Sequence, residues 1–510
     1  MQIIDSSQSK SIYLSLKKSS KKCKNIKIEY VSVNVVSMHL SPETLSCKRS
    51  GIRRTIACVS KITETKIGGL KMKSSVRFAA FLLSAAMVVT ASGCGGGSGG
   101  NQAEFPTYGT DSMEIGVFSS PAPTQEAYDE CAEAGFTYVL IDQNYASLTS
   151  EGYREILNYC NNAGMKSIPM TFNENDQTDF TDVPGYAGKF FWDEPSYDNY
   201  DTIAEWVAGF EAKNGTDKLF YVNLFPFFST NLGCDTYEEY LQGYVDKVLS
   251  KVHGEKWLSV DIYPLCRNTR ESYIYDGYLY NLEASAQIAL TNPDILVHYY
   301  VQTHGHGYVG NQYRNLESVA DIRFQYNCAM AYGVKAFAAF TYPSQGGADF
   351  SIGQGLVKNT QVGSTWKTER TPVYDSVKQA NEELKAWDEV YLSFNYKGTK
   401  AVIGSQNEHG YNSNFDMLAH NKEKLKGVRS VTATQDTLIG EFSNNGTRAY
   451  MITNFAEPSS GMTDKVVMTL EMGDKAQVYI NGEMQVKEVV DNQLAVTLKS
   501  GEAAFVVIAN

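Results

Sequence analysis

Cysteine is scarce in this sequence, and the spacing of the cysteines does not indicate disulfides, redox motifs or zinc sites. Nine cysteines occur in 510 residues, and no two of them stand in the CxxC pattern of redox and zinc sites. The main body of the chain holds five, which are Cys131, Cys160, Cys234, Cys266 and Cys328. An odd number without that spacing indicates neither a disulfide framework nor a zinc site. We therefore expect buried free thiols.

An excess of positive charge is missing from most of the chain. The net charge is −12, yet residues 1–93 hold 16 Lys and Arg against 4 Asp and Glu, which leaves 29 against 53 for residues 94–510. Proteins bind nucleic acids and anionic surfaces through an excess of positive charge. Residues 94–510 are too acidic to bind nucleic acids or anionic surfaces through general electrostatics. Their charge suits a neutral ligand.

Long apolar runs are also missing, apart from one short stretch near the N-terminus. Phe78–Thr90 is apolar, follows Lys73 and Arg77, and leads into Ala91-Ser-Gly-Cys94 and a glycine-rich tether. The run is too short for a secure membrane span, and the order of charged, apolar and small residues is that of a signal peptide. Small residues directly before a cysteine resemble a bacterial lipobox. The pattern predicts lipidation of Cys94, with an ordinary secretory signal or a retained anchor as alternatives.

This stretch divides the N-terminal part of the chain into three expected segments. Residues 72–94 form the signal peptide, and residues 95–107 form the tether. Residues 1–71 are basic, rich in Ser and Lys, and show no sustained helical or strand period. They are either upstream sequence translated from a misplaced start or a basic extension. We expect an exported lipoprotein at the cell surface, attached to the membrane only through the lipid on Cys94.

The rest of the chain lacks internal repeats and has the composition of a protein with a large core. Aromatic residues make up 12% and charged residues only 20%. From Met113, short apolar runs alternate with amphipathic stretches, a pattern typical of a parallel sheet with crossover helices. The expected strands are Glu114–Phe118, Thr137–Ile141, Lys166–Thr171, Lys189–Trp192, Leu219–Leu224, Trp257–Ile262, Leu296–Gln302 and Val334–Phe340. The expected helices are Thr124–Ala134, Ser150–Ala163, Tyr200–Ala212, Thr236–Lys251, Leu279–Leu290, Leu316–Tyr332 and Asp375–Trp387.

Eight strands in about 230 residues predict an α/β fold, a (β/α)8 or TIM barrel over residues 108–392. Only the link between the third and fourth strands lacks a clear helix. Residues 393–510 change to short alternating strands with turn signals at Asn445-Gly446 and Asn481-Gly482. This part predicts a small C-terminal all-β sandwich.

In such a barrel the active site lies at the C-terminal ends of the strands, and polar residues gather there in this sequence. Two carboxylates facing one pocket, with aromatic rings and amides around them, are the parts that glycoside cleavage needs. The candidates for catalysis are Glu194, Asp261 and Asp193. The candidates for sugar contacts are Asp142, Tyr145, Asn173, Trp192, Asn223, Tyr263, Gln302, His304 and Tyr342.

Each candidate also has a purely structural interpretation. Asp193-Glu194-Pro195 could cap the next helix, and Asp261 could be a buried partner of Arg267 or Arg270. The histidines near residue 304 could mark a metal site, but no third ligand follows with suitable spacing. We therefore expect no metal and no other cofactor.

The segments that carry these residues resemble a known group of enzymes. Phe-Phe-Trp-Asp-Glu-Pro, residues 190–195, resembles the Asn-Glu-Pro motif of the clan of retaining (β/α)8 glycosidases, whose Glu is the acid/base. Residues 221–226, 258–264 and 323–343 resemble bacterial secreted glycosyl-hydrolase-like lipoproteins. The resemblance implies a glycoside hydrolase acting on an oligo- or polysaccharide outside the cytoplasm, with Glu194 as general acid. The alternative is a carbohydrate-binding lipoprotein on a degenerate barrel.

Two positions depart from the pattern of that clan. The clan's Asn before the acid/base is Asp193 here, and the clan's nucleophilic Glu at the end of the seventh strand is replaced by Gln302 in that region. An amide cannot form the glycosyl ester, so the resemblance leaves the second carboxylate open. Asp261 is the leading candidate, with Asp193 or a nucleophile supplied by the substrate as alternatives.

Overall fold

The computed structural model describes residues 105–171, 178–266, 277–307, 313–346, 351–352, 354–407 and 413–509. All of them belong to one compact unit of the chain, Gly97–Asn510. The expected extension, the signal peptide with Cys94 and the candidate Asn173 lie outside the described residues. None of the helices in the described part combines the length and the apolarity needed to cross a bilayer.

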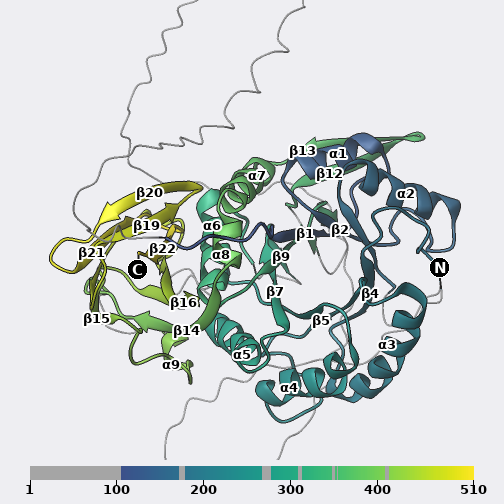
Figure 1. The fold of residues 1–510 in the computed structure, drawn as a ribbon. Helices are drawn as coiled ribbons and strands as arrows, with labels where there is room; N and C mark the ends of the chain where they lie inside the picture. Colours follow the sequence, from purple (N-terminus) through teal and green to yellow (C-terminus); the bar gives the residue numbers. More distant parts are fainter. Residues whose placement is uncertain are drawn as a thin grey trace, which may run out of the picture. The chain divides into compact units, whose positions relative to one another are not determined.

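Eight parallel strands form the centre of the fold, as the sequence predicts (Figure 1). They hydrogen-bond in the order β3-β2-β1-β9-β7-β6-β5-β4. Parallel bridges from Ser167 to Tyr186 and from Met170 to Phe190 join β3 to β4, so the ring closes into a barrel. The strands are β1 (Glu114–Phe118), β2 (Tyr138–Ile141), β3 (Lys166–Pro169), β4 (Gly188–Asp193), β5 (Leu219–Leu224), β6 (Lys256–Asp261), β7 (Ile295–Gln302) and β9 (Ala336–Phe340).

Helices surround the ring and pair with its strands in sequence, which confirms the expected (β/α)8 order. Thr124 and Ser150 accept the backbone N–H groups of Ala127 and Tyr153, so both predicted N-caps are present. The described part of the link between β3 and β4, residues 178–187, contains no helix. The helices are α1 (Gln125–Glu133), α2 (Glu151–Asn162), α3 (Tyr200–Asn214), α4 (Tyr237–Lys247), α5 (Tyr278–Thr291), α6 (Val319–Ala331), α7 (Pro372–Lys385) and α8 (Asp388–Leu392).

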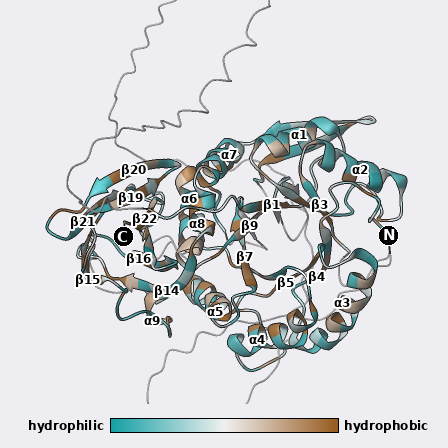
Figure 2. Ribbon diagram, in the orientation of Figure 1, coloured by the Kyte–Doolittle hydropathy of each residue, from teal (hydrophilic) through white to brown (hydrophobic). Residues whose placement is uncertain are grey.

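The barrel strands bury apolar side chains on both of their faces. Figure 2 shows much of the ribbon of these strands in the brown of hydrophobic residues. One cluster fills the interior of the barrel and is rich in aromatic rings, among them Tyr138, Phe190, Tyr221, Trp257 and Tyr300. A larger cluster lies between the strands and the surrounding helices. Strand residues alternate between the two clusters, so the parity of a residue decides whether its side chain can reach the centre of the ring.

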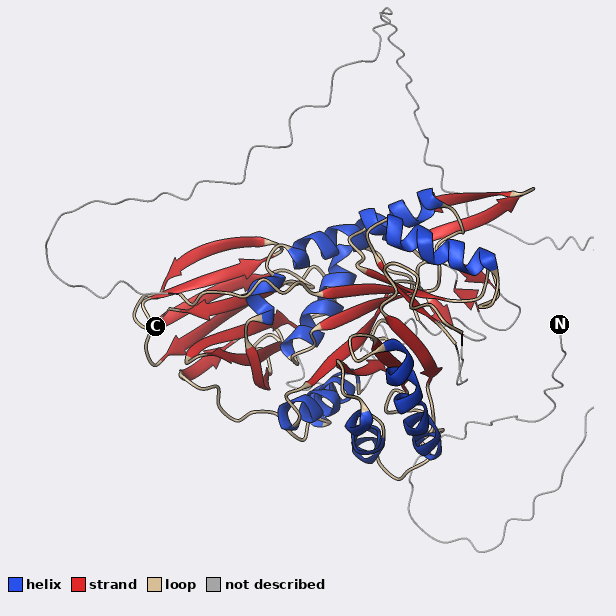
Figure 3. Cartoon of the chain, turned by 45° about the vertical axis from the view of Figure 1, so that its right-hand side comes forward, coloured by secondary structure: helices blue, strands red, loops and turns tan. Residues whose placement is uncertain are grey.

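Residues after the barrel form two antiparallel sheets around a second core, which confirms the predicted sandwich (Figure 3). The turns at Asn445-Gly446 and Asn481-Gly482 have positive φ at both residues, as two-residue hairpin turns require. The six-stranded sheet contains β14 (Asn395–Val402), β16 (Thr437–Asn444), β17 (Thr447–Asn454), β22 (Ala503–Ile508), β19 (Lys475–Ile480) and β20 (Glu483–Glu488). The three-stranded sheet contains β15 (Val428–Thr432), β18 (Asp464–Leu470) and β21 (Gln493–Leu498).

The sandwich packs directly on the barrel. Trp387, just after α7, stacks on Phe505 of β22 with ring centroids 5.5 Å apart. Asn327 of α6 donates to the backbone carbonyl of Gly501 at 2.8 Å. The larger barrel cluster therefore continues into one face of the sandwich, which adds Phe442, Phe505 and Val507 to it.

A hairpin between β9 and α7 was not expected from the sequence. It consists of β12 (Val357–Val362) and β13 (Thr365–Arg370) and projects beyond the helices (Figure 3). Arg370 holds its base against α1 through Glu130 and Glu133. Three two-residue strands form a further small sheet: β8 (His306–Gly307), β10 (Gln345–Gly346) and β11 (Ser351–Ile352).

Candidate active site

An irregular register between β4 and β5 decides which side chains at the end of β4 face the barrel interior. Phe190 pairs with Tyr221, yet Asp193, three residues later, pairs with Asn223, only two residues later. The additional residue on β4 is a bulge, which reverses the parity of the strand beyond it. Asp193 therefore lies on the same side of the sheet as Phe190, in the barrel interior.

The same bulge turns Trp192 away from the interior. Trp192 stacks on Trp206 of α3, with ring centroids 5.6 Å apart and planes 21° apart. It packs against the outer core, between the barrel and its helices. This position contradicts the predicted sugar contact of Trp192, because a shift of one residue moves a side chain to the other face.

Glu194 stands just past the end of β4 in an unusual backbone conformation. Its φ is +57°, in the left-handed region that costs a non-glycine residue about 1–2 kcal/mol. Its N–H donates to the carbonyl oxygen of Asn223 at 2.9 Å, which fixes the chain there. A strained backbone that its surroundings hold in place is common at functional sites.

Asn223 joins two carboxylates from neighbouring strands. Its Nδ2 donates to Oδ1 of Asp193 at 3.2 Å and to Oδ1 of Asp261 at 3.3 Å. Only 4% of Asn223 is exposed. The ends of β4, β5 and β6 therefore bring together two of the predicted catalytic residues and one predicted sugar contact, and Glu194 follows directly after.

Burial in this cluster raises the pKa of all three carboxyl groups. The pKa of Glu194 rises to about 9, first by burial and then by the charges of Asp261 and Asp193. Burial and the charge of Asp193 raise the pKa of Asp261 to about 7. Burial raises the pKa of Asp193 to about 6, although the amide of Asn223 opposes the shift. Glu194 therefore keeps its proton at neutral pH, next to carboxyl groups that lose theirs more readily.

Tyr263, a predicted sugar contact, lies beside this cluster. A hydrogen bond between Tyr263 and Asp261 stabilises the ionised form of that carboxyl. The ring stacks on Phe340 at the end of β9, with centroids 5.4 Å apart. His304 contacts the same Phe340, with ring centroids 5.0 Å apart, and is fully buried.

Gln302 and Tyr342 do not belong to the site surface, which contradicts both predicted sugar contacts. Gln302 is 0% exposed, and its side chain accepts from the N–H of Leu265 and donates to the carbonyls of Leu265, His304 and Arg314. Its amide therefore fixes the loops after β6 and β7. Tyr342 is buried in the outer core, where its ring meets the edge of Phe136 at 6.3 Å.

Asp142 and Tyr145 stand at the end of β2 and have partners of their own. Asp142 accepts from the Ser120 hydroxyl at 3.2 Å and from Nδ2 of Asn144 at 2.7 Å. These bonds hold together the loops that follow β1 and β2. Tyr145 is partly exposed, packs edge-on against Trp366 of the β12–β13 hairpin at 5.0 Å, and accepts from Asn359 at 3.0 Å. The alternative partners considered for Asp261, Arg267 and Arg270, lie outside the described residues.

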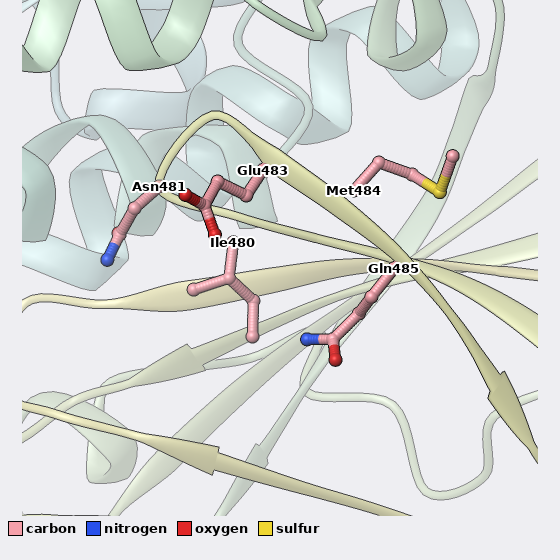
Figure 4. A pocket seen from close by; sticks show the side chains of 5 residues that line it. All are labelled: Ile480, Asn481, Glu483, Met484 and Gln485. Carbon is pink, nitrogen blue, oxygen red and sulfur yellow. The ribbon is translucent and has the colours of Figure 1, made fainter.

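The described residues offer no second cluster with comparable chemistry. No three His, Cys, Asp or Glu side chains gather as a metal ion would need in the part of the chain that the structure describes. A hollow of about 410 Å³ lies on the β19–β20 hairpin and is lined by Ile480, Asn481, Glu483, Met484 and Gln485 (Figure 4). Its described lining holds one carboxylate and no aromatic ring.

Comparison with known proteins finds likeness in structure alone. No protein-family model and no curated protein matches the sequence. A structure titled "Glycoside hydrolase" aligns with 11% identity and a TM-score of 0.45, over 78% of this chain and 93% of its own. A putative alpha-galactosidase from Bacteroides fragilis aligns with 11% identity and a TM-score of 0.42, over 78% and 79%. An Anoxybacillus alpha-amylase aligns with 10% identity and a TM-score of 0.43, over 78% and 98%.

These similarities are similarities of fold alone. At such identities and TM-scores they do not determine what this protein acts on.

Two buried polar residues, in register with Asn223 on the next two strands of the ring, were not predicted from the sequence. Ser259 on β6 and His298 on β7 lie in otherwise apolar strands and are both fully buried. A polar residue inside a buried strand, at the parity of Asn223, is the pattern that could have indicated them.

Proposed function

We propose that this protein is a glycoside hydrolase in which Glu194 is the general acid and Asp261 the second carboxylate. The observation that carries the proposal is the group of three carboxyls at the ends of β4 and β6, with the highest pKa on Glu194. Cleavage of a glycosidic bond needs one protonated and one ionised carboxyl at the same place.

The protonated Glu194 gives its proton to the glycosidic oxygen as the bond from that oxygen to the anomeric carbon breaks. The departing sugar leaves as a neutral alcohol, and Glu194 becomes a carboxylate. Asp261 either attacks the anomeric carbon or takes a proton from the water that does so. Asn223 holds Asp261 and Asp193 by its amide, so both carboxylates keep their positions while charge develops on the sugar.

A carbohydrate is the substrate class that suits the surroundings of these groups. The main body of the chain is acidic, which disfavours anionic ligands and leaves neutral ones. Tyr263 borders Asp261 and supplies an aromatic ring with a hydroxyl, a combination that binds sugars through stacking and hydrogen bonds. Export and lipidation at Cys94 are part of the proposal and rest on the sequence pattern of residues 72–94.

The test is a screen of a chain that starts at Gly95 against aryl glycosides and polysaccharides, with product release and binding measured in parallel. The proposal expects release of reducing sugar or aryl alcohol from at least one class. Tight binding without any product would favour the alternative, a carbohydrate-binding barrel. Wild-type bacteria fed with labelled fatty acid should label the protein, whereas a Cys94→Ser variant should carry no label; equal labelling of both would contradict the lipid anchor.

A further inference from the structure

A chain of hydrogen bonds crosses the barrel interior and ends at the amide of Asn223. The hydroxyl of Tyr138 on β2 lies 2.7 Å from Nε2 of His298 on β7. Nδ1 of His298 lies 2.9 Å from Oγ of Ser259 on β6. That Oγ lies 2.9 Å from Oδ1 of Asn223 on β5. All four side chains are buried, so water does not replace these bonds.

The number of available hydrogens gives this chain a direction. Nδ2 of Asn223 faces the carboxylates of Asp193 and Asp261, so its Oδ1 has to accept, and the Ser259 hydroxyl is the donor. Ser259 has one hydrogen and donates it to Asn223. It therefore accepts from the hydroxyl of Tyr221, which lies 2.9 Å away and can act as the donor. Nδ1 of His298 must therefore carry a hydrogen and donate it to Ser259.

The state of the other ring nitrogen follows. Burial lowers the pKa of His298 to about 3, although the carbonyl of Phe337 opposes the shift, so the imidazole is neutral and carries one hydrogen. With that hydrogen on Nδ1, Nε2 has a lone pair. Tyr138 then donates to Nε2. The hydroxyl lies 2.7 Å from that nitrogen and 3.0 Å from the carbonyl of Phe337, so these two acceptors share its one hydrogen.

The other tautomer would break the connection to the carboxylates. With the hydrogen on Nε2, Nδ1 of His298 would take the hydrogen of Ser259. Two oxygens 2.9 Å apart, on Ser259 and Asn223, would then face each other with no hydrogen between them. Turning the Asn223 amide over would relieve this contact but would point its oxygen at two carboxylates.

The ring of His298 is also held in place by packing. Trp257 stacks on it with centroids 5.0 Å apart and planes 11° apart. Tyr221 and Tyr300 meet its edges at 5.6 and 5.2 Å. The imidazole therefore has one orientation, and the two ring nitrogens are fixed toward different partners.

We propose that His298 is a positioning residue, which through Ser259 fixes the amide of Asn223 with its nitrogen toward Asp193 and Asp261. The inference rests on the proposed function of that carboxyl cluster. His298 itself touches neither carboxylate, and its contribution is to select one of the two orientations of the amide. Loss of the Nδ1 hydrogen should therefore weaken turnover more than binding.

Two variants of one residue separate this role from packing. In His298→Asn the side-chain amide nitrogen can occupy the place of Nδ1 and donate to Ser259, whereas in His298→Gln the amide lies near the place of Nε2. His298→Gln should lower kcat on the order of 10- to 100-fold, the size of effect that misplacement of catalytic groups causes, with little change in KM. His298→Asn should recover most of that loss. Equal losses in both variants, in proportion to their melting temperatures, would overturn the positioning role.

The tautomer can be measured without any activity. In the full chain with ¹⁵N-labelled histidine, the His298 signals, identified by their absence in His298→Asn, should show a protonated Nδ1 and a bare Nε2. Tyr138→Phe, which removes only the hydroxyl, should shift part of the population to the Nε2-protonated form. A protonated Nε2 in the wild-type protein would overturn the inference. If the protein cleaves no glycoside, the proposed function fails, and the spectrum still decides the hydrogen-bonded chain.

Discussion

The ionisation of three carboxyl groups is the residue-scale basis of the proposed chemistry. Glu194, Asp193 and Asp261 stand within the reach of one another's charges, and each pKa is raised chiefly by burial. The group with the highest pKa stays protonated and can act as an acid, whereas the others ionise first and can act as base or nucleophile. The same three residues would be costly if they served stability alone, because each ionised form is poorly solvated.

The pH profile of kcat/KM should therefore be a bell that lies between about pH 7 and pH 9. Below about pH 7 the rate falls because Asp261 takes up a proton and cannot attack or accept one. Above about pH 9 it falls because Glu194 loses the proton that it must donate. The measurement is initial rate against pH for a glycoside that the wild-type protein cleaves. Ordinary carboxyl groups have pKa values of about 4. A pH optimum near 5 would indicate such ordinary values and contradict the raised ones.

At the scale of single elements, the bulge in β4 and the loop after β7 decide the shape of the site. The sequence could predict that Asp193-Glu194 follows a strand, because that depends on a local apolar run. It could not predict that the parity changes inside Phe190–Trp192, because a bulge is fixed by pairing with β5. For that reason Trp192 was assigned to the pocket and lies in the outer core instead.

Gln302 shows a second limit of predicting the role of a side chain from its position at the end of a single strand. Its place at the end of β7 suggested a sugar contact, but its partners come from the loops after β6 and β7, which a local pattern does not place together. Tyr342 likewise follows a strand and points between the barrel and its helices. In both cases the strand end was predicted correctly and the direction of the side chain was not.

Replacing Gln302 by Glu should not restore the nucleophile of the resembled clan. A carboxylate cannot donate to the carbonyls of Leu265, His304 and Arg314, so Gln302→Glu should place a buried charge against three acceptors. We expect a loss of about 2–4 kcal/mol in the free energy of unfolding, measured by urea denaturation, and no gain in activity. Gln302→Met, which removes the amide without adding charge, is the control and should lose less. An active Gln302→Glu protein of unchanged stability would contradict this role.

At the scale of the whole molecule, the barrel and the sandwich are joined next to the catalytic end. Arg314, in the segment that follows β7, donates to Asp321 at the start of α6 at 3.2 Å and to Glu457 of the sandwich at 3.1 Å. The three charged side chains are almost fully buried. The backbone carbonyl of the same Arg314 accepts from Gln302, so the sandwich supports the loop that Gln302 fixes.

Arg314→Met should be far more damaging than Glu457→Gln. Removing the guanidinium leaves two buried carboxylates without a cation and should cost about 3–5 kcal/mol, because an uncompensated buried charge is expensive. Glu457→Gln leaves Arg314 paired with Asp321 and should cost less than about 1.5 kcal/mol. Urea denaturation of the two variants gives the comparison. Equal losses of unfolding free energy in the two variants would show that the contact between Arg314 and Glu457 does not depend on charge.

The architecture itself was largely predictable because strands and helices alternate regularly along the chain. Eight apolar strands that alternate with seven amphipathic helices leave few other folds, and each predicted barrel strand lies within two residues of the observed bounds at both ends. The β12–β13 hairpin was missed because its strands are mostly exposed and polar, so they lack the apolar alternation that marks a strand. What the sequence could not supply is pairing between distant segments, on which the bulge, the Gln302 loop and the His298 chain all depend.

The most direct test of Glu194 as general acid compares two leaving groups in Glu194→Gln. A glycoside with a poor leaving group, such as an alkyl alcohol or a sugar, needs the proton, whereas an activated dinitrophenyl glycoside leaves without it. We predict a loss in kcat of about 10²–10⁴-fold for the first substrate and less than about tenfold for the second, with the fold unchanged by circular dichroism. Unchanged hydrolysis of the poor leaving group, or an equal loss for both substrates, would contradict the assignment.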